Sequence, residues 1–464
     1  MPDLPTDQNA LINLLDRAVT HHQANELDQA GTLYRQFLAQ APRHSRGWTN
    51  LGALLRKQGS YPAAIAAHRR ALQLEPDLES AQNNLANALN DIGAYREAVD
   101  LRRALLAKAP DDPVRIRDLA VSLRGDWAHE EVIALVDAAE QRLDMTGQGE
   151  LILQRSLSHL MLGNYSQGFR DFEGRYDGNE VSLPKEMPFP RWTGEEIAGK
   201  KVLIMPEQGF GDAIVMTRFL PRLMEMGAEP WMLVKKPLMR LLQGLDGVSN
   251  GQLHLISEAR RSHGFDFYTP NMSLPHLVGL AENKPPPPPR FKIPEESRAR
   301  AQALVAPFSD QFRIGVVWTG SLTYNANHRR ASGPEAFLPL IDTPDTQLFS
   351  LYKGDAHGAF LASGMAGLIT DACQEDRDFA DTAAVIEQMD LLITTDTAVV
   401  HVAASMGKPI WNLLSHEGFW LYGTGETTPW YPSMRLFRQK TPGDWTEVFA
   451  RVKSELISHL EQNR

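Results

Sequence analysis

The chain has 464 residues, of which 43% are hydrophobic and 22% charged, and this predicts a folded globular protein of about three domains. Its formal net charge of −10 excludes nucleic acid as the main partner, because binding a phosphate backbone needs a concentrated basic face. The single cysteine, Cys373, excludes an internal disulfide and a thiolate zinc cluster. No stretch approaches the roughly 18 apolar residues of a membrane span, and the start lacks a secretory signal pattern, so we expect a cytoplasmic protein.

Helical periodicity dominates the first part of the chain, and an internal repeat runs through it. Prolines and small residues each recur every 34 residues, at Pro42, Pro76 and Pro110 and at Ala30, Ala64 and Ala98. An ordinary helical bundle has no reason to keep a fixed period. The pattern resembles the tetratricopeptide repeat, a pair of antiparallel helices in which the small residue lets the helices approach and the proline ends the second helix.

The clear repeats extend over residues 11–112 and degenerate towards residue 176, which predicts a repeat domain over 1–182. Repeat arrays of this kind present a concave surface that binds an extended peptide or another protein. The first part of the chain is therefore predicted to be a partner-binding arm.

The later part changes to short β-rich runs that alternate with helices, as in parallel α/β sheets. Strands are predicted for a first sheet at 202–205, 231–234 and 265–268, and for a second sheet at 314–318, 348–351, 391–394 and 409–411. Prolines at 184–190 and 285–289 mark linkers, and an amphipathic helix is predicted over 445–460. We expect Rossmann-like domains over 183–290 and 291–464, with a ligand cleft between them at the carboxyl ends of the strands.

A glycine-containing loop follows the first predicted strand. It consists of Glu207, Gln208, Gly209, Phe210, Gly211 and Asp212. The loop is not a dinucleotide-binding fingerprint, because Ile214 stands at the third glycine position. Asp212 can be read as a helix cap or as a general base that faces a bound substrate, and chemistry alone favours neither.

Two loops of the second predicted sheet suit a phosphate. Asp396, Thr397 and Ala398 lead from a buried strand into a helix that carries His401, and such a helix start offers unpaired N–H groups to an anion. The alternative is that Asp396 and Thr397 only cap the helix and His401 lies satisfied in the interior. Another strand ends at Thr319 and Gly320, and Arg330 follows. A guanidinium binds diphosphate oxygens in pairs, although an arginine run is more often a solvated surface.

Four motifs together carry a resemblance to a known family. They are 207–212, 378–384, 396–401 and 429–438, with the sequences EQGFGD, DFADTAA, DTAVVH and PWYPSMRLFR. They look like a bacterial family of repeat-bearing glycosyltransferases whose catalytic half is similar to the ADP-heptose:lipopolysaccharide heptosyltransferases, which have the GT-B fold. The resemblance covers roughly residues 11–460 and implies that Asp212 is the base. It also implies that Asp396, Thr397, Ala398 and His401 bind the donor's diphosphate. The sequence departs from the family pattern in two places. Ala398 stands where the heptosyltransferases have a glycine, and residues 416–422 stand where the repeat-bearing family often has an acidic, tryptophan-rich stretch.

The resemblance implies an inverting, metal-independent glycosyltransferase that needs no cofactor besides its nucleotide-sugar co-substrate. The donor would be held by the second Rossmann-like domain, at the residues Thr319, Gly320, Arg330, Lys353, Asp396, Thr397, Ala398 and His401. The acceptor would enter over the first, and the repeat arm suggests that it is a protein, for example flagellin or another surface protein. The alternative is a non-catalytic repeat scaffold with a nucleotide-binding half. A nucleotide-sugar epimerase is disfavoured, because it has no evident need for a docking arm.

Overall fold

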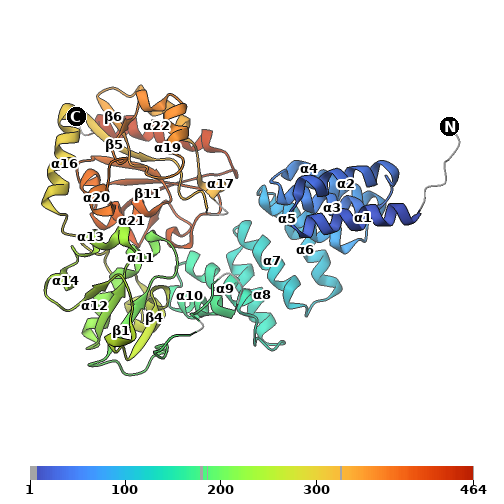
Figure 1. Cartoon of the computed structure of the whole chain (residues 1–464), viewed down its shortest axis with the longest axis horizontal. Coiled ribbons are helices and arrows are strands. Elements are labelled where there is room, and N and C mark those ends of the chain that lie inside the picture. Colours follow the sequence, from blue (N-terminus) through green and yellow to red (C-terminus); the bar gives the residue numbers. More distant parts are fainter. Residues whose placement is uncertain (1–7, 178–180, 185, 324–326, 463–464) are drawn as a thin grey trace. The chain divides into compact units, whose positions relative to one another are not determined.

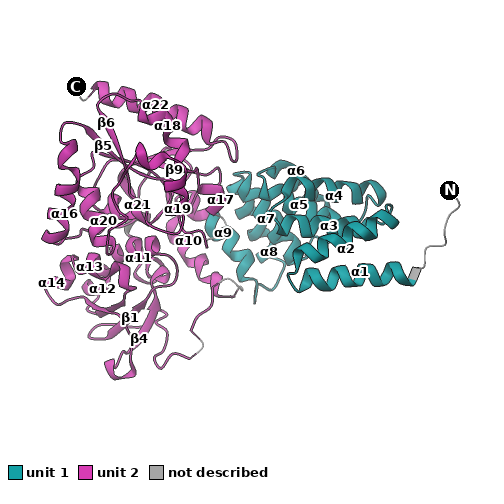
Figure 2. Ribbon diagram, turned by 45° about the horizontal axis from the view of Figure 1, so that its top comes forward, with its two compact units in different colours: residues 1–158 teal, residues 159–464 magenta. Residues whose placement is uncertain are grey.

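A computed structural model describes residues 8–177, 181–184, 186–323 and 327–462 (Figure 1). The chain divides into two compact units, residues 1–158 and 159–464 (Figure 2). A search of the described helices finds none that combines the length and the apolar character needed to cross a membrane.

The first unit is a stack of antiparallel helix pairs (Figure 1). Its helices are α1 (Gln8–Gln23), α2 (Leu27–Gln40), α3 (Ser45–Lys57), α4 (Tyr61–Leu74), α5 (Glu79–Asp91), α6 (Tyr95–Lys108), α7 (Pro113–Gly125) and α8 (His129–Glu140), and α9 (Gly149–Met161) begins in it. The second helices of the pairs begin at Leu27, Tyr61, Tyr95 and His129, so the 34-residue step continues into the fourth pair. That pair lacks the proline and the glycine that mark the repeats before it.

A left-handed turn residue joins the two helices of each pair. Its backbone φ is positive at Asn25 (63°), Gly59 (76°), Gly93 (79°) and Trp127 (65°), which stand at equivalent positions of the period. Glycine adopts this conformation freely, whereas tryptophan is strained in it. The fourth repeat therefore keeps the turn although its sequence signal is lost.

The small residues predicted to bring the helices together lie in the interior of this unit. Ala30, Ala64 and Ala98 are all fully buried, and Val132, at the equivalent position of the fourth pair, is fully buried too. The regular spacing of these positions packs each helix pair against the next one.

The second unit opens with α10 (Tyr165–Asp171) and a 3₁₀ helix, η1 (Phe172–Asp177), and continues with a parallel sheet. The strands are β1 (Lys201–Met205), β2 (Glu229–Leu233), β3 (His254–Ile256) and β4 (Phe267–Pro270), in the order β3-β2-β1-β4. The helices of this part are α11 (Phe210–Met216), α12 (Leu220–Glu225), α13 (Met239–Leu242), α14 (Asp246–Ser249) and α15 (Leu274–Val278). We call this part the first sheet region.

The second sheet region carries a larger sheet in the order β10-β11-β9-β8-β5-β6-β7, parallel except for β10. Its strands are β5 (Phe312–Val317), β6 (Thr346–Ser350), β7 (Thr370–Asp371), β8 (Leu391–Thr395), β9 (Ile410–Leu414), β10 (Thr427–Thr428) and β11 (Tyr431–Arg438). Its helices are α16 (Glu295–Val305), α17 (Asn327–Arg330), α18 (Leu338–Ile341), α19 (His357–Ala362), α20 (Phe379–Glu387), α21 (Ala398–Ser405) and α22 (Trp445–Gln462). Strands β8 and β9 are buried at every position, as expected for inner strands of a parallel sheet.

The predicted fold class is confirmed, since tetratricopeptide-type helix pairs precede two Rossmann-like α/β regions, the pair that makes up a GT-B fold. Each predicted strand overlaps an observed one. Strands β3, β7, β10 and β11 were not predicted, and β11 carries most of the motif at 429–438.

Candidate active site

In each sheet the order of the strands reverses next to a strand that is followed by one of the loops singled out from the sequence. In the first sheet the strand order reverses between β1 and β4, and in the second it reverses between β5 and β8. Ligands of open α/β sheets bind at such reversals, outside the carboxyl ends of the strands. The loop that ends in Asp212 follows β1, the Thr319–Gly320 turn follows β5, and Asp396 follows β8.

These loops line one cleft of about 1020 Å³ within the second unit. The first sheet region contributes the loop from Met205 to Asp212 and Lys235. The second contributes Gly320, Ser321, Thr323, Arg330, Asp396, Thr397, Ala398, His401 and Phe419. The structure thus brings most of the candidate residues together in one cleft.

Helix α11 of the first sheet region packs directly against helix α21 of the second. Gly211 and His401 are in close contact across this junction, because a Cβ atom at residue 211 would lie 2.6 Å from the His401 Cδ2 atom. Only glycine leaves room for the imidazole here. This contact holds the Asp212 side of the cleft against the His401 side.

His401 is a buried, neutral imidazole. Its Nδ1 atom lies 3.2 Å from the hydroxyl of Tyr431, on β11. Burial, with the positive charge of Arg218 as a second cause, lowers the pKa of His401 to about 3. His401 can therefore donate a hydrogen bond to a ligand at neutral pH, but it cannot supply a positive charge.

Asp212 makes a helix-capping contact and also has a perturbed pKa. Its Oδ2 atom accepts a hydrogen bond from the Gly209 backbone N–H at 3.0 Å. Burial raises its pKa to about 6, the charges of Asp396 and Glu207 act in the same direction, and the Gly209 hydrogen bond opposes them. A carboxylate with this pKa is ionised at neutral pH and is a better proton acceptor than an exposed aspartate. Both interpretations of Asp212 are thus compatible with the geometry.

Arg330 lies across the Gly320 turn. Its Nη1 atom donates to the Asp396 carbonyl oxygen at 2.8 Å, and its Nε atom donates to the Asn327 Oδ1 atom at 3.1 Å. The Gly320 N–H donates to the same Asn327 oxygen at 3.1 Å. A Cβ atom at residue 320 would overlap the Arg330 guanidinium, so the glycine is required for the arginine to occupy this place.

Asp396 faces the cleft just before α21 begins. The Tyr422 hydroxyl donates to its Oδ1 atom at 2.6 Å. Burial raises the pKa of Asp396, while the Tyr422 hydrogen bond and the charge of Arg330 oppose that rise. Thr397 is the residue before the first turn of α21, and Ala398 is its first residue.

Two predicted donor-binding residues are not among the residues that line the cleft. Thr319 is buried, and its hydroxyl accepts a hydrogen bond from the Asn327 side-chain amide at 2.9 Å, so it supports the turn from behind. Lys353 donates from its Nζ atom to the carbonyl oxygens of Gln374 and Asp376. Their proposed contact with a donor remains a prediction.

Glu207 and Gln208 have partners of their own. The Glu207 carboxylate forms a two-point pair with the buried guanidinium of Arg175, with both N–O distances at 2.8 Å. This pair ties η1 to the loop after β1. The Gln208 carbonyl oxygen accepts a hydrogen bond from the Lys235 ammonium at 3.0 Å.

Sequence reasoning missed several residues of the cleft and its support, namely Arg175, Tyr176, Lys235, Asn327 and Tyr422. A signal existed for Lys235, because it directly follows a predicted strand, which was the argument used for the turn near Arg330. Tyr422 and Arg175 come from distant segments, so no local pattern places them at the cleft.

The motif at 378–384 joins the two sheet regions. Asp378 caps α20 by accepting from the Ala380 N–H at 3.0 Å, and its oxygens also lie 3.0 and 3.1 Å from the Arg240 Nη1 atom on α13. Asp381, which is fully buried, accepts from the Ser297 hydroxyl at 2.6 Å and pairs with Arg377 at 2.8 Å. This motif has a structural explanation and does not line the cleft.

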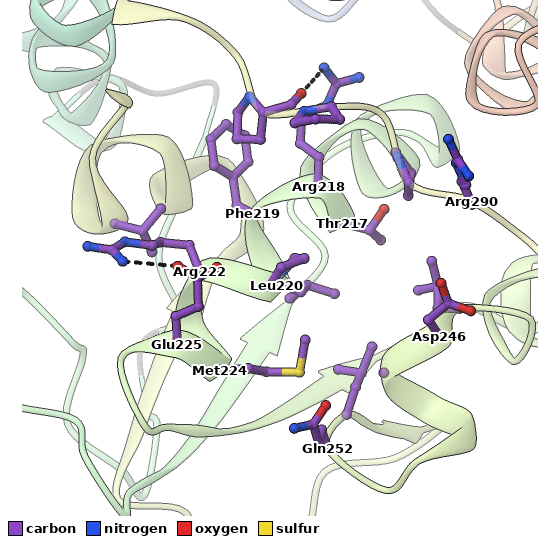
Figure 3. A pocket seen from close by; sticks show the side chains of 18 of the residues that line it. Thr217, Arg218, Phe219, Leu220, Arg222, Met224, Glu225, Asp246, Gln252 and Arg290 are labelled. Carbon is purple, nitrogen blue, oxygen red and sulfur yellow. Dashed lines mark hydrogen bonds and ion pairs between the residues drawn. The ribbon is translucent and has the colours of Figure 1, made fainter. Parts of the chain in front are cut away.

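A second cavity of about 970 Å³ is lined by residues of α12 and by the proline run 286–289 (Figure 3). Leu220 and Met224 give it an apolar wall, and Arg222, Asp246 and Arg290 stand around it. Arg222 is paired with Glu225 at 3.0 Å. Across the described residues, no cluster of three or more histidine, cysteine, aspartate or glutamate side chains is arranged to hold a metal ion.

The fold and the cleft define a tetratricopeptide-repeat protein with a two-sheet α/β region. The sequence profile of the tetratricopeptide repeat matches residues 45–78. Protein FlbA of Caulobacter vibrioides is 27% identical over 320 residues, which are 64% of this chain and 53% of FlbA. The chain thus spans about half the length of that relative.

Solved structures resemble each part separately. The glycosyl transferase family 9 protein from Veillonella parvula covers 56% of this chain and 91% of its own, with 15% identity and a TM-score of 0.41. YrrB, a tetratricopeptide-repeat protein with an unusual peptide-binding site, covers 37% of this chain and 87% of its own, with 13% identity and a TM-score of 0.32. A MamA protein from Desulfovibrio magneticus covers 36% of this chain and 90% of its own, with 17% identity and a TM-score of 0.32.

Proposed function

We propose that this protein is an inverting glycosyltransferase that moves a sugar from a nucleotide-sugar to an acceptor without a divalent metal. The observation that carries the proposal is a cleft with a carboxylate on one wall and groups suited to phosphate on the other. Asp212 stands on the first wall, and Arg330 with the start of α21 stands on the second.

The second wall suits the diphosphate of a donor. The first turn of α21 offers backbone N–H groups, and the helix dipole adds a partial positive charge at Thr397 and Ala398. Arg330 supplies a full positive charge beside them, and His401 supplies a neutral hydrogen-bond donor. These groups would stabilise the negative charge that develops on the leaving nucleoside diphosphate, which is the role that a metal ion plays in other phosphate sites.

Asp212 would act as the base. It would take the proton from an acceptor hydroxyl, whose oxygen would attack the anomeric carbon from the face opposite the leaving group and invert it. A pKa of about 6 suits this role, because the group is ionised at pH 7 and still binds a proton readily. The capping contact with Gly209 would hold the carboxylate in place.

The repeats would recognise the acceptor, which we propose to be a protein. Stacked helix pairs of this kind provide an extended surface for a polypeptide, and the first unit has a core of its own, separate from the core of the α/β unit. The competing proposal is a repeat scaffold whose α/β part binds a nucleotide without turnover. The raised pKa of Asp212 favours the enzyme, because perturbed carboxylates concentrate at catalytic sites.

A thermal-shift panel of nucleotide-sugars, run in excess chelator, tests the proposal. A donor present at about 100 times its dissociation constant stabilises a protein by about 2.7 kcal/mol. The Arg330→Gln variant should lose the response, whereas Arg222→Gln, which alters a paired arginine at the other cavity, should keep it. A panel without any shift would refute the donor site. Binding without nucleoside diphosphate release, with candidate acceptors present, would favour the scaffold.

A further inference from the structure

Behind the donor wall of the cleft, three side chains from different elements form a buried chain. Arg218 follows α11, Tyr431 begins β11, and His401 lies on α21. Their side chains are almost completely enclosed, with exposed fractions of 3%, 0% and 5%. Only His401 of the three lines the cleft.

Arg218 is a buried cation held by backbone carbonyl groups. Its Nη1 atom donates to the oxygens of Pro286 and Trp430, both at 3.1 Å, and its Nε atom donates to the Val215 oxygen at 3.1 Å. No carboxylate among the described residues forms an ion pair with it. A buried charge without a counter-ion is costly, so its retention calls for an explanation beyond packing.

The guanidinium lies against the ring of Tyr431. Its carbon is 4.8 Å from the centre of that ring and 4.9 Å from the centre of the Trp430 ring. A nearby positive charge orients the hydroxyl dipole with the oxygen toward the cation and the hydrogen away from it. The Tyr431 hydroxyl has polar neighbours besides Arg218: the Nδ1 atom of His401 lies 3.2 Å from it, and the Ser405 side chain also interacts with it.

A hydroxyl that donates to Nδ1 fixes the histidine tautomer. If Nδ1 accepts a hydrogen bond, the proton of the neutral imidazole must be on Nε2. The Nε2 atom lies at the Gly211 contact, 3.1 Å from where a Cβ atom of residue 211 would stand, at the boundary between the two walls of the cleft. The Nε2–H edge of His401 is therefore the edge that faces the Gly211 loop, and His401 is one of the residues that line the cleft.

We propose that Arg218 and Tyr431 are positioning residues that hold His401 as an Nε2–H donor for the ligand in the cleft. The inference rests on the proposed function for the identity of the ligand, a nucleoside diphosphate. The tautomer itself belongs to the ligand-free protein. The same arrangement explains why an arginine without a carboxylate lies in this interior, since a paired arginine would orient the hydroxyl less strongly.

The test is the protonation state of the two ring nitrogens of His401, read by NMR in the intact protein labelled with ¹⁵N-histidine. The His401→Gln variant identifies the signals by their loss. We expect an unprotonated Nδ1 and a protonated Nε2 across neutral pH. A proton on Nδ1 would overturn the proposal and leave the glycosyltransferase proposal untouched.

Two variants separate positioning from packing. Tyr431→Phe keeps the ring and removes the hydroxyl, so the His401 signals should report a mixture of tautomers, and Arg218→Lys, which keeps the charge, should preserve the wild-type pattern. Calorimetry with UDP, GDP, CDP and ADP in turn should show about 3- to 10-fold weaker binding by Tyr431→Phe, the value of one hydrogen bond. A folded Tyr431→Phe protein with unchanged tautomer and unchanged affinity would refute the positioning role.

Discussion

Replacing Asp212 by asparagine separates the two interpretations of this residue, because the catalytic and structural effects have opposite signs. Asparagine keeps an oxygen that can accept from the Gly209 N–H, so the cap survives, but it cannot accept a proton. If Asp212 is the base, the turnover should fall about 10²- to 10⁴-fold. Donor affinity should change little, because Asp212 stands on the opposite wall from Arg330.

Above pH 6, the same variant should be more stable than the wild-type protein. Burial raises the pKa of Asp212 from 3.8 to about 6, so the folded state binds the proton more tightly than the unfolded state. Ionising the group in the folded protein therefore costs free energy, and this cost is fully present above pH 6 and absent below pH 3.8. Two pKa units correspond to about 3 kcal/mol, which we reduce to about 1–2 kcal/mol because solvent reaches part of the carboxylate.

The assay is the midpoint of thermal unfolding of the α/β unit, followed at pH 8 and pH 5 for wild type and Asp212→Asn. We expect the variant to unfold a few degrees higher at pH 8 and the difference to shrink at pH 5. Asp246→Asn, an exposed matched control, should show no such pattern. Normal turnover in the stabilised variant would refute the role of Asp212 as the base. If the gain in unfolding temperature does not depend on pH, the claim that burial raises the pKa of Asp212 is refuted.

The remaining predictions concern the glycines, the joint between the sheet regions and the repeats. Gly320→Ala should displace Arg330 and weaken nucleotide binding at least 10-fold by calorimetry, with the fold intact by circular dichroism. Arg240→Ala should leave the buried Asp381 with one cation fewer and lower the unfolding free energy of the α/β unit by about 2–4 kcal/mol in urea titrations. A protein that begins at residue 148 should fold and bind a nucleotide-sugar but lose transfer to the natural acceptor protein, and undiminished transfer would contradict docking by the repeats. A protein that begins at residue 183 lacks Arg175, leaves Glu207 without its partner, and should be less stable in the same titration.

Much of the fold could be predicted because its signals are local. The 34-residue step is set by single residues at turns and helix contacts, and the inner strands β5, β8 and β9 are apolar runs with clear ends. The strand β3 was missed because its burial is only partial, and β10 because it is two residues long. Trp127 shows the limit of such reasoning, since it adopts a left-handed turn that its residue type disfavours.

The candidate site was predictable to the extent that its residues follow strands directly. Gly320 and Asp396 follow the adjacent strands β5 and β8, so the topology of the second sheet brings them together, whereas Asp212 follows β1 of the other sheet and joins them through the packing of α11 on α21. Their hydrogen-bond partners come from other segments of the chain. The Tyr422 hydroxyl contacts Asp396, and the Tyr431 hydroxyl contacts His401. No spacing in the sequence encodes these contacts, because they arise from tertiary packing.

We propose that the cleft transfers a sugar from a nucleotide donor with Asp212 as the base. The most direct test is the release of nucleoside diphosphate from a nucleotide-sugar found by the binding panel, measured in excess chelator with the acceptor protein present. We expect acceptor-dependent release with an inverted anomeric configuration in the product, and a loss of about 10²-fold or more in Asp212→Asn. Release that requires a divalent metal, retains the configuration or is unchanged in Asp212→Asn would contradict it.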